Sequence, residues 1–271
     1  MNNLASRIVV AVPLGAAAIY AALHGGWLLV AVIAVAAVIA LHEFYGMVRD
    51  LRPLVPAGFA GVLTALAAVH HGGVAWAAGP LIGMVVLAFW LSAVAEVRQP
   101  AVVQLAATVF GAVWIGLGFV FLVAVRDLPG EHGLGRELLL AVLIGVWASD
   151  IAAFTIGRLF GRRLLAAEIS PAKTVEGFVA GLVVGTAAVF FTLYREPHGE
   201  PLSTLHALEF GVAIALAAPI GDLLESYVKR DMGVKDAGRL LGGHGGMLDR
   251  VDALLLAAPA AYFLALAIGR A

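Results

Sequence analysis

The chain has 271 residues, of which 62% are hydrophobic and 13% are charged. Soluble domains average about 45–50% apolar and about 25% charged residues, so this composition excludes an ordinary water-soluble enzyme. A net charge of -1, from 17 basic and 18 acidic residues, argues against a nucleic-acid partner. The chain has no cysteine, which excludes disulfides and thiolate chemistry. The excess apolar surface is expected to face membrane lipid.

Nine apolar segments approach the length of about 20 residues that a helix needs to cross a bilayer. They run over Ile8 to His24, Trp27 to Val48, Val55 to His70, Val74 to Ala95, Val102 to Val125, Leu138 to Gly157, Val175 to Tyr194, Leu205 to Val228, and Val251 to Ile268. We predict an all-α, polytopic integral membrane protein with about nine transmembrane helices. These spans leave no room for a separate soluble domain.

The connections between nine spans alternate between the two sides of the membrane. One side carries only four of the 17 Lys and Arg residues, namely Arg126, Arg136, Arg195 and Arg270. The positive-inside rule places the other, more basic side in the cytoplasm. We therefore predict a protein of the cytoplasmic (inner) membrane, with the N-terminus inside, the C-terminus outside, and Gly-rich and basic loops facing the cytoplasm.

The eighth span ends with charged residues, which cost about 2.5–3.5 kcal/mol each inside a membrane. Its sequence GDLLESYVKR spaces Asp222, Glu225, Ser226 and Lys229 at i, i+3, i+4 and i+7. One helix face therefore carries two carboxylates, a hydroxyl and an ammonium.

A third acid, Asp150, lies in the sixth span, eight residues before Arg158, as Asp222 lies eight residues before Arg230. Eight helical residues rise about 12 Å, so the two acids are expected at the same depth. The alternative for Asp150 is a hydrogen bond or ion pair between helices.

The ninth span begins LDRVD, which puts Asp249 and Asp252 on one face, three residues apart. Two interpretations of these acids remain open. They either stabilise the start of the helix or contribute ligands to a site shared with the acids above. Glu43, at the inner end of the second span, either lines the same cavity or faces water.

The connection before the ninth span, DMGVKDAGRLLGGHGGMLDRVD, contains six glycines interleaved with Lys235, Arg239, His244 and Arg250. Gly-rich backbone followed by a helix start can bind phosphates through N–H groups, and the basic side chains favour this interpretation over simple flexibility. A second basic connection, RLFGRRLLAAEISPAKTVEG, is predicted to turn at Ser170 and Pro171. Its Thr174 is either a phosphate contact or a helix-start residue.

These features together predict a site for a metal ion and a polyphosphate. Mg²⁺ is typically held by one or two carboxylates together with substrate phosphates. No Walker A or Rossmann pattern is present. Gly177, Gly181 and Gly185 have the spacing typical of close helix packing or of a dimer face.

The run SYVKRDMGVKDAGRLLGGHGGMLDRVD resembles the signature of the phosphatidate cytidylyltransferases, also called CDP-diacylglycerol synthases. The segments SDIAAFTIGRLFGR and SPAKTVEG resemble the same family, whereas Ala172 and Gly242 replace a lysine and a proline that are usual in it. The resemblance implies that CTP and phosphatidate are converted to CDP-diacylglycerol and pyrophosphate. It also implies Mg²⁺, a second, monovalent cation such as K⁺, and a homodimer.

The resemblance implies roles for individual residues. The catalytic residues are Asp222, Asp249, Lys229, Lys235 and Arg250. Substrate-binding residues are Ser170, Lys173, Thr174, Ser226, Arg230, Asp236, Gly243, His244, Gly245, Gly246 and Asp252. The resemblance implies that Asp222 and Asp249 bind the metal, and we expect Asp150 and Glu225 to shape or share the metal site. We predict a single transmembrane catalytic domain over 1–271, in which the spans at 1–126 form a lipid-facing scaffold and those at 137–269 carry the active site.

Two other functions compete with this interpretation. A CTP-dependent polyprenol or lipid kinase would transfer the γ-phosphate of CTP and release CDP. A cation-coupled transporter would also place acids within the membrane, but it is expected to have polar residues near the midplane and an internal repeat.

Overall fold

The computed structural model describes residues 3–94, 99–130, 133–194, 202–238 and 245–269. Its N-terminal elements are α1 (Asn3–His24), α2 (Gly26–Met47), η1 (Arg49–Leu51), α3 (Val55–Gly72), η2 (Val74–Ala77), α4 (Ala78–Val94), α5 (Ala101–Gly111), η3 (Ala112–Gly116) and α6 (Leu117–Arg126). They are followed by α7 (Leu134–Phe160), β1 (Leu164–Ala166), β2 (Ser170–Thr174), α8 (Val175–Leu193), α9 (Thr204–Asp231) and α10 (Leu248–Ala267).

The predicted all-α membrane fold is confirmed. Within the described residues, eight helical segments are long and apolar enough to cross a membrane, and the apolar helix Val12–His24 is shorter. The segment Ala101–Arg126 contains a feature that the hydropathy pattern did not predict. Its central residues, Ala112–Gly116, form a π-helix between α5 and α6.

The chain folds into two compact units, which we call the first and the second unit. The first comprises Met1–Ala124 and Asp236–Arg250, and the second comprises Val125–Lys235 and Val251–Ala271. The Gly-rich connection before α10 is therefore grouped with the N-terminal spans, which we had predicted to be only a scaffold.

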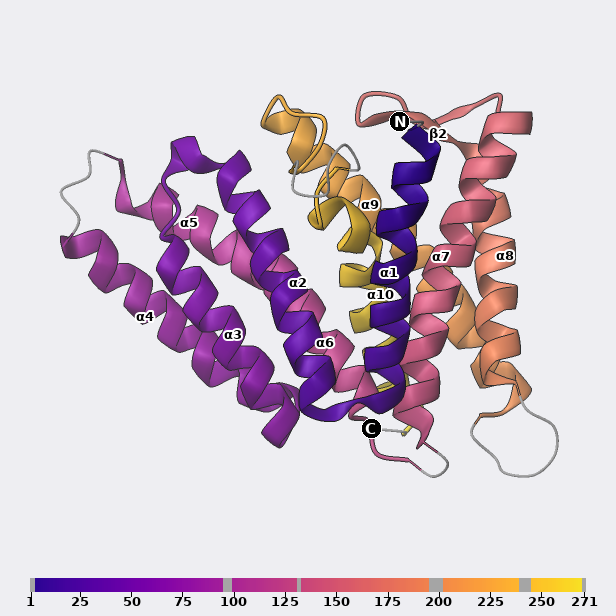
Figure 1. The fold of residues 1–271 in the computed structure, drawn as a ribbon, viewed down its shortest axis with the longest axis horizontal. Coiled ribbons are helices and arrows are strands. Elements are labelled where there is room, and N and C mark those ends of the chain that lie inside the picture. Colours follow the sequence, from indigo (N-terminus) through magenta and orange to yellow (C-terminus); the bar gives the residue numbers. More distant parts are fainter. Residues whose placement is uncertain (1–2, 95–98, 131–132, 195–201, 239–244, 270–271) are drawn as a thin grey trace. The chain divides into compact units, whose positions relative to one another are not determined.

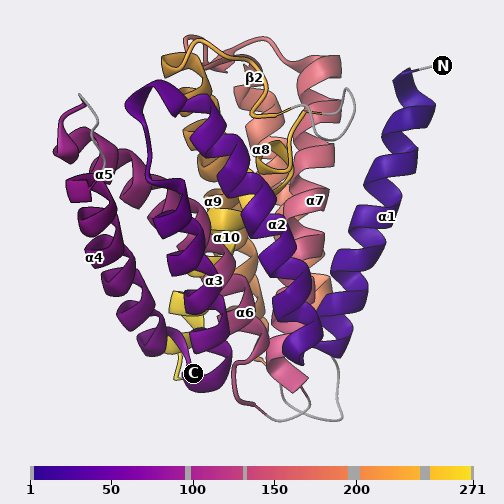
Figure 2. The same cartoon turned by 60° about the vertical axis from the view of Figure 1, so that its left-hand side comes forward.

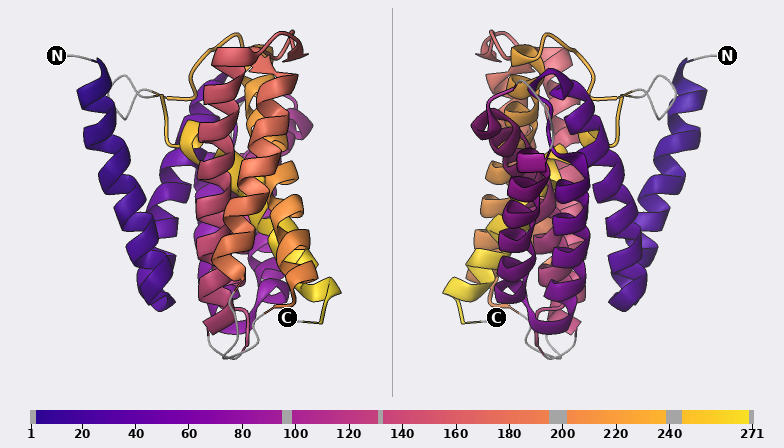
Figure 3. Two further views of the ribbon diagram at one scale, coloured as in Figure 1. Left: turned by 90° about the vertical axis from the view of Figure 1, so that its right-hand side faces the viewer. Right: turned by 90° about the vertical axis from the view of Figure 1, so that its left-hand side faces the viewer.

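In the first unit, α2, α3 and α4 run side by side, and α1 diverges from α2 beyond the turn that joins them (Figures 2 and 3). Gly25 and Gly26 at this turn have φ values of 68° and 58°, which favour glycine. The hydroxyl of Tyr45 donates to the carbonyl of Thr108 at 2.9 Å, and the Thr108 hydroxyl accepts from the Leu54 amide at 2.7 Å. These bonds connect α2, α5 and the start of α3.

In the second unit, α7 and α8 lie side by side (Figure 1). Gly177, Gly181 and Gly185 form their contact: a Cβ atom at Gly181 or at Gly185 would lie 2.9 Å from a Ser149 atom. The close-packing interpretation of this stripe is confirmed. Because α7 already occupies it, the stripe is not available as a dimer face.

The connection between α7 and α8 forms an antiparallel hairpin in which Leu164 pairs with Thr174 and Ala166 with Ser170. Our prediction of a turn at Ser170 and Pro171 is wrong, because both residues lie in β2. The chain turns over residues 167–169, where the Ile169 amide donates to the Ala166 carbonyl at 3.1 Å. A two-stranded hairpin has edge positions that need no N–H donor, so a strand can contain this proline.

Candidate active site

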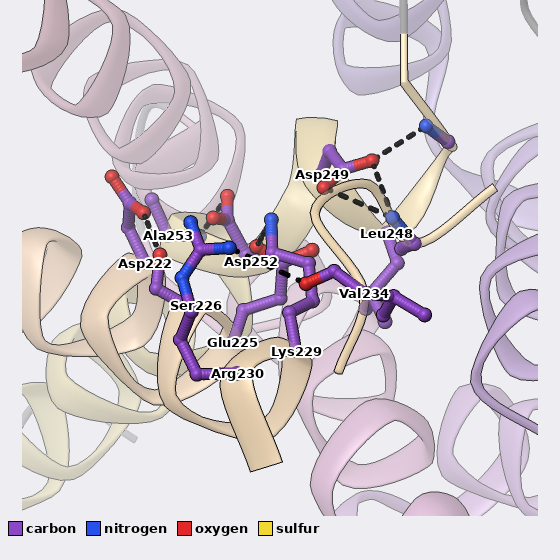
Figure 4. Close-up of polar contacts among 12 residues, drawn as sticks. Asp222, Glu225, Ser226, Lys229, Arg230, Val234, Leu248, Asp249, Asp252 and Ala253 are labelled. Carbon is purple, nitrogen blue, oxygen red and sulfur yellow. Dashed lines mark hydrogen bonds and ion pairs between the residues drawn. The ribbon is translucent and has the colours of Figure 1, made fainter. Parts of the chain in front are cut away.

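The charged face predicted at the end of α9 is present in the structure (Figure 4). The Ser226 hydroxyl donates to a carboxylate oxygen of Asp222 at 3.4 Å. One turn further along, the Lys229 ammonium lies 2.5 Å from the Glu225 carboxylate, and their side chains are only 10% and 1% exposed. A buried charge needs a partner, and the i, i+4 spacing supplies it within the helix.

Helix α10 places a third acid next to this face of α9. Carboxylate oxygens of Asp222, Glu225 and Asp252 all lie within 4.8 Å of one another. The close approach depends on Gly221, because a Cβ atom there would overlap the Asp252 carbonyl oxygen and lie 3.2 Å from the Cα atom of Ala253. From the sequence we predicted that Asp252 binds substrate, and the only sequence signal at Gly221 was its position beside Asp222.

Lys173, at the end of β2, brings a second ammonium to the three acids. Its Nζ atom lies 2.6 Å from an Asp222 carboxylate oxygen. The neighbouring Thr174 caps α8 by accepting a hydrogen bond from the Gly177 amide at 3.1 Å, so its helix-start interpretation is confirmed. The strand pairing of β2 and the helix cap at Thr174 together fix where the Lys173 backbone lies in space.

A cavity of about 490 Å³ opens beside these residues in the second unit. Its polar lining comes from Ser149, Asp150, Arg158, Ser170, Lys173, Thr174 and Asp222. Its apolar lining includes Val146, Phe154, Leu165, Phe178, Ala218 and Pro219. Asp150 and Asp222 therefore line one cavity, in agreement with the equal depth predicted from their spacing. The cavity suits a ligand with a charged head and an apolar body.

The acid group fits a divalent cation by the chemistry of its donors. Two of the three carboxylates are buried, and the ammonium groups of Lys173 and Lys229 pair with Asp222 and Glu225. Oxygen donors of this kind suit hard cations such as Mg²⁺. Asp150 and Asp249, which we predicted to share the metal site, are not in this group of three, the only such group within the described residues.

Asp249 lies in the first turn of α10 and is assigned to the first unit. Its carboxylate accepts hydrogen bonds from the Gly246 amide at 2.6 Å and from the Ala237 amide at 3.1 Å (Figure 4). Asp249 thus joins the two ends of the Gly-rich connection. The stabilisation of the helix start that we considered for it is present, in the form of a first-turn acid that reaches back to a preceding amide.

The remaining predicted residues lie outside the acid group. The Arg230 guanidinium donates to the carbonyls of Ile169 at 3.2 Å and Val234 at 3.4 Å, which joins the hairpin to the end of α9. Lys235, Asp236 and Arg250 are exposed, and Gly245 has a φ of 74°. Gly243 and His244 lie outside the described residues.

Residues 5–268 match the Cytidylyltransferase family. The chain is 36% identical over 278 aligned residues to the phosphatidate cytidylyltransferases of Mycobacterium bovis and Mycobacterium tuberculosis. These alignments cover 97% of this chain and 88% and 82% of the two relatives. It is also 39% identical to the phosphatidate cytidylyltransferase of Bacillus subtilis, over 56% of this chain and 55% of that protein. The match extends over nearly the whole length, so this chain belongs to the cytidylyltransferase family.

Proposed function

We infer that this protein is a phosphatidate cytidylyltransferase, an integral membrane enzyme that makes CDP-diacylglycerol and pyrophosphate from CTP and phosphatidate in phospholipid biosynthesis. The observation that carries this function is the group of three acids and two lysines beside a cavity that is polar at one part and apolar at another. Family membership favours this function over a cation-coupled transporter.

Phosphatidate fits the cavity of the second unit. Its phosphate would lie near Lys173 and Arg158, and its acyl chains would lie along Phe154, Phe178 and Pro219. Ser170 and Thr174 offer hydroxyl groups to the same headgroup. Ala172 also lines the cavity, so the lysine that is usual in the family at this position contributes no charge here.

We propose that the triphosphate of CTP is bound by the other signature residues. These are Ser226, Lys229, Arg230, Lys235, Asp236, Gly243, His244, Gly245, Gly246 and Arg250. The amide of Gly246 already donates to Asp249 in this structure, so phosphate contacts are expected mainly from basic side chains and from the other glycines.

We propose that Asp222, Glu225 and Asp252 hold Mg²⁺, with Asp249 as a further ligand and Asp150 shaping the site. Each carboxylate oxygen has two lone pairs, so Asp249 can bind a metal and still accept backbone hydrogen bonds. Bound Mg²⁺ would neutralise phosphate charge during displacement at phosphorus. A second, monovalent cation such as K⁺, as the resemblance implies, belongs to the same proposal.

The reaction is a single displacement. A phosphate oxygen of phosphatidate attacks the α-phosphorus of CTP, and the bond to the β-phosphate oxygen breaks as pyrophosphate leaves. The attacking oxygen is already an anion, so neither a general base nor a covalent enzyme intermediate is required. Lys173 orients the nucleophilic phosphate, and Lys229, Lys235 and Arg250 stabilise the charge that develops on the triphosphate.

Asymmetry of basic residues supports a cytoplasmic site, with the N-terminus inside and the C-terminus outside. A homodimer is part of the proposal. Because the glycine stripe of α8 is used within the chain, the dimer must use another surface.

The test uses purified protein in detergent with phosphatidate, Mg²⁺ and CTP labelled in either the α- or the γ-phosphate. We expect label to enter the lipid fraction from α-labelled CTP only. Transfer of the γ-label would instead identify a lipid kinase, and no transfer of either label by folded protein would contradict the proposed function.

A further inference from the structure

Glu43 of α2 is a buried acid that the mechanism above does not use. Only 6% of the residue is exposed, although it lies at the inner end of a membrane span. One of its carboxylate oxygens, Oε2, accepts a hydrogen bond from the amide of Leu248 at 2.9 Å. Leu248 is the first residue of α10 and directly precedes Asp249 and Arg250. All of these residues belong to the first unit.

The Glu43 carboxylate explains why two positions of the Gly-rich connection are glycine. A Cβ atom at Gly238 or at Gly246 would overlap the carboxylate group of Glu43. Neither glycine has a φ in the left-handed region, so backbone conformation does not require glycine at these positions. Glycine is required there because a larger residue would not fit beside the Glu43 carboxylate.

We propose that Glu43 is a positioning residue for cytidylyl transfer, which holds the first turn of α10 and through it the catalytic Asp249 and Arg250. Glu43 and Asp249 act on the same short segment from two directions. Asp249 bonds the amides of Ala237 and Gly246, while Glu43 bonds the amide of Leu248 and packs against Gly238 and Gly246. The segment is thereby fixed to α2. The functional part of this proposal rests on the proposed function.

The kinetic effect should be specific to the nucleotide and the metal. Displacing a catalytic group by about 1 Å can cost about 100-fold in rate, and we expect Glu43→Ala to lower kcat/KM for CTP by about that factor. Its Mg²⁺ requirement should rise, because Asp249 is a proposed ligand. The KM for phosphatidate should stay within about twofold, because every residue that lines the lipid cavity belongs to the second unit. Glu43→Gln keeps an acceptor for the Leu248 amide and should recover most of the activity.

Glycine substitutions supply a sharper test. Gly246→Ala should impair the parent protein by forcing a methyl group against the Glu43 carboxylate, but it should cost almost nothing further in the Glu43→Ala background. Gly46→Ala is the matched control on α2, because a Cβ atom there meets nothing within 4 Å. Glu137→Ala controls for loss of a buried glutamate that is 4% exposed and lies in α7. It should leave the KM for CTP unchanged.

Hydrogen exchange separates this proposal from the proposed function. In the protein without substrates, Glu43→Ala should speed exchange at the Leu248 amide, which loses its acceptor, and Glu43→Gln should not. Unchanged exchange, an unchanged kcat/KM for CTP, or additive effects of the Glu43→Ala and Gly246→Ala changes would each overturn the proposal. A parent protein that makes no CDP-diacylglycerol would overturn the proposed function, while the exchange result would still decide whether Glu43 holds α10.

Discussion

Two acids on α9, in the second unit, are held by lysines. Asp222 pairs with Lys173, and Glu225 pairs with Lys229. The carboxylate oxygens paired with these ammonium groups are also those that would hold the proposed Mg²⁺, and a lysine displaced by the metal would be free to bind a substrate phosphate. These pairs suit groups that must change partners during a reaction.

Glu43 and Asp249, two acids of the first unit, are held by backbone amides instead. Glu43 accepts from Leu248, and Asp249 accepts from Ala237 and Gly246. Backbone donors cannot leave without unfolding the segment that carries them. The difference between these two pairs of acids lies in their partners: the lysine partners of Asp222 and Glu225 suit a change of partner during the reaction, and the amide partners of Glu43 and Asp249 suit positioning.

The largest expected effect comes from removing a charge of the lysine-paired group. Asp222→Asn keeps the size of the side chain but loses a metal-binding anion and the partner of Lys173, so we expect kcat to fall about 1,000-fold. Incorporation of α-labelled CTP into lipid measures this loss. Asp231→Asn, an exposed acid on the same helix, is the control and should remain active. Near-normal activity of Asp222→Asn would contradict the proposed role of Asp222 in catalysis.

Lys229→Met is expected to unfold the site as well as inactivate it. It leaves Glu225, which is 1% exposed, without its ammonium partner, and breaking a buried pair in this way costs about 3–5 kcal/mol. Thermal denaturation in detergent should show a lower Tm. The double variant Lys229→Met with Glu225→Gln should recover much of the Tm but not the activity. Recovery of both would mean that the pair serves only the fold.

Asp249→Asn tests whether Asp249, which is held by backbone amides, also binds the metal. Asparagine keeps an oxygen acceptor for the Gly246 amide but loses the negative charge, so we expect a loss of about 100-fold if Asp249 also binds the metal. The Mg²⁺ dependence of the rate measures this directly. A loss below about fivefold, with unchanged Mg²⁺ dependence, would place Asp249 with the positioning acids alone.

Glu176→Gln should have the smallest effect. Glu176 lies in the second unit and accepts from the amides of Arg162 and Arg163, at 3.0 and 3.2 Å, as Glu43 accepts from an amide; it also pairs with the exposed Arg163 guanidinium at 3.6 Å. We expect kcat to stay within about threefold and the Tm to change little, because glutamine keeps an oxygen acceptor for the two amides and only an exposed ion pair with Arg163 is lost. A large loss of activity at normal Tm would contradict the distinction drawn from partners.

Local periodicity was enough to predict the helices and part of the site. Within the described residues, apolar runs identified the eight segments that are long enough to cross a membrane and a shorter apolar helix, and the i, i+3, i+4 and i+7 spacing identified the charged face of α9. Both follow from the geometry of one helix. The hairpin of β1 (Leu164–Ala166) and β2 (Ser170–Thr174) was missed because these short strands carry no alternating pattern of their own. Their pairing stabilises a segment whose Ser-Pro sequence is typical of a turn.

By itself, the sequence determined that this protein is helical, that it spans the membrane, and which family signature it carries, because composition, helical period and motif spacing are properties of neighbouring residues. Only the tertiary structure decided which acids meet. It placed Asp252 with Asp222 through the close approach at Gly221, and Glu43 against Leu248, a residue 205 positions away. Contacts of this kind depend on where helices cross, and no spacing along a single helix encodes the crossing point.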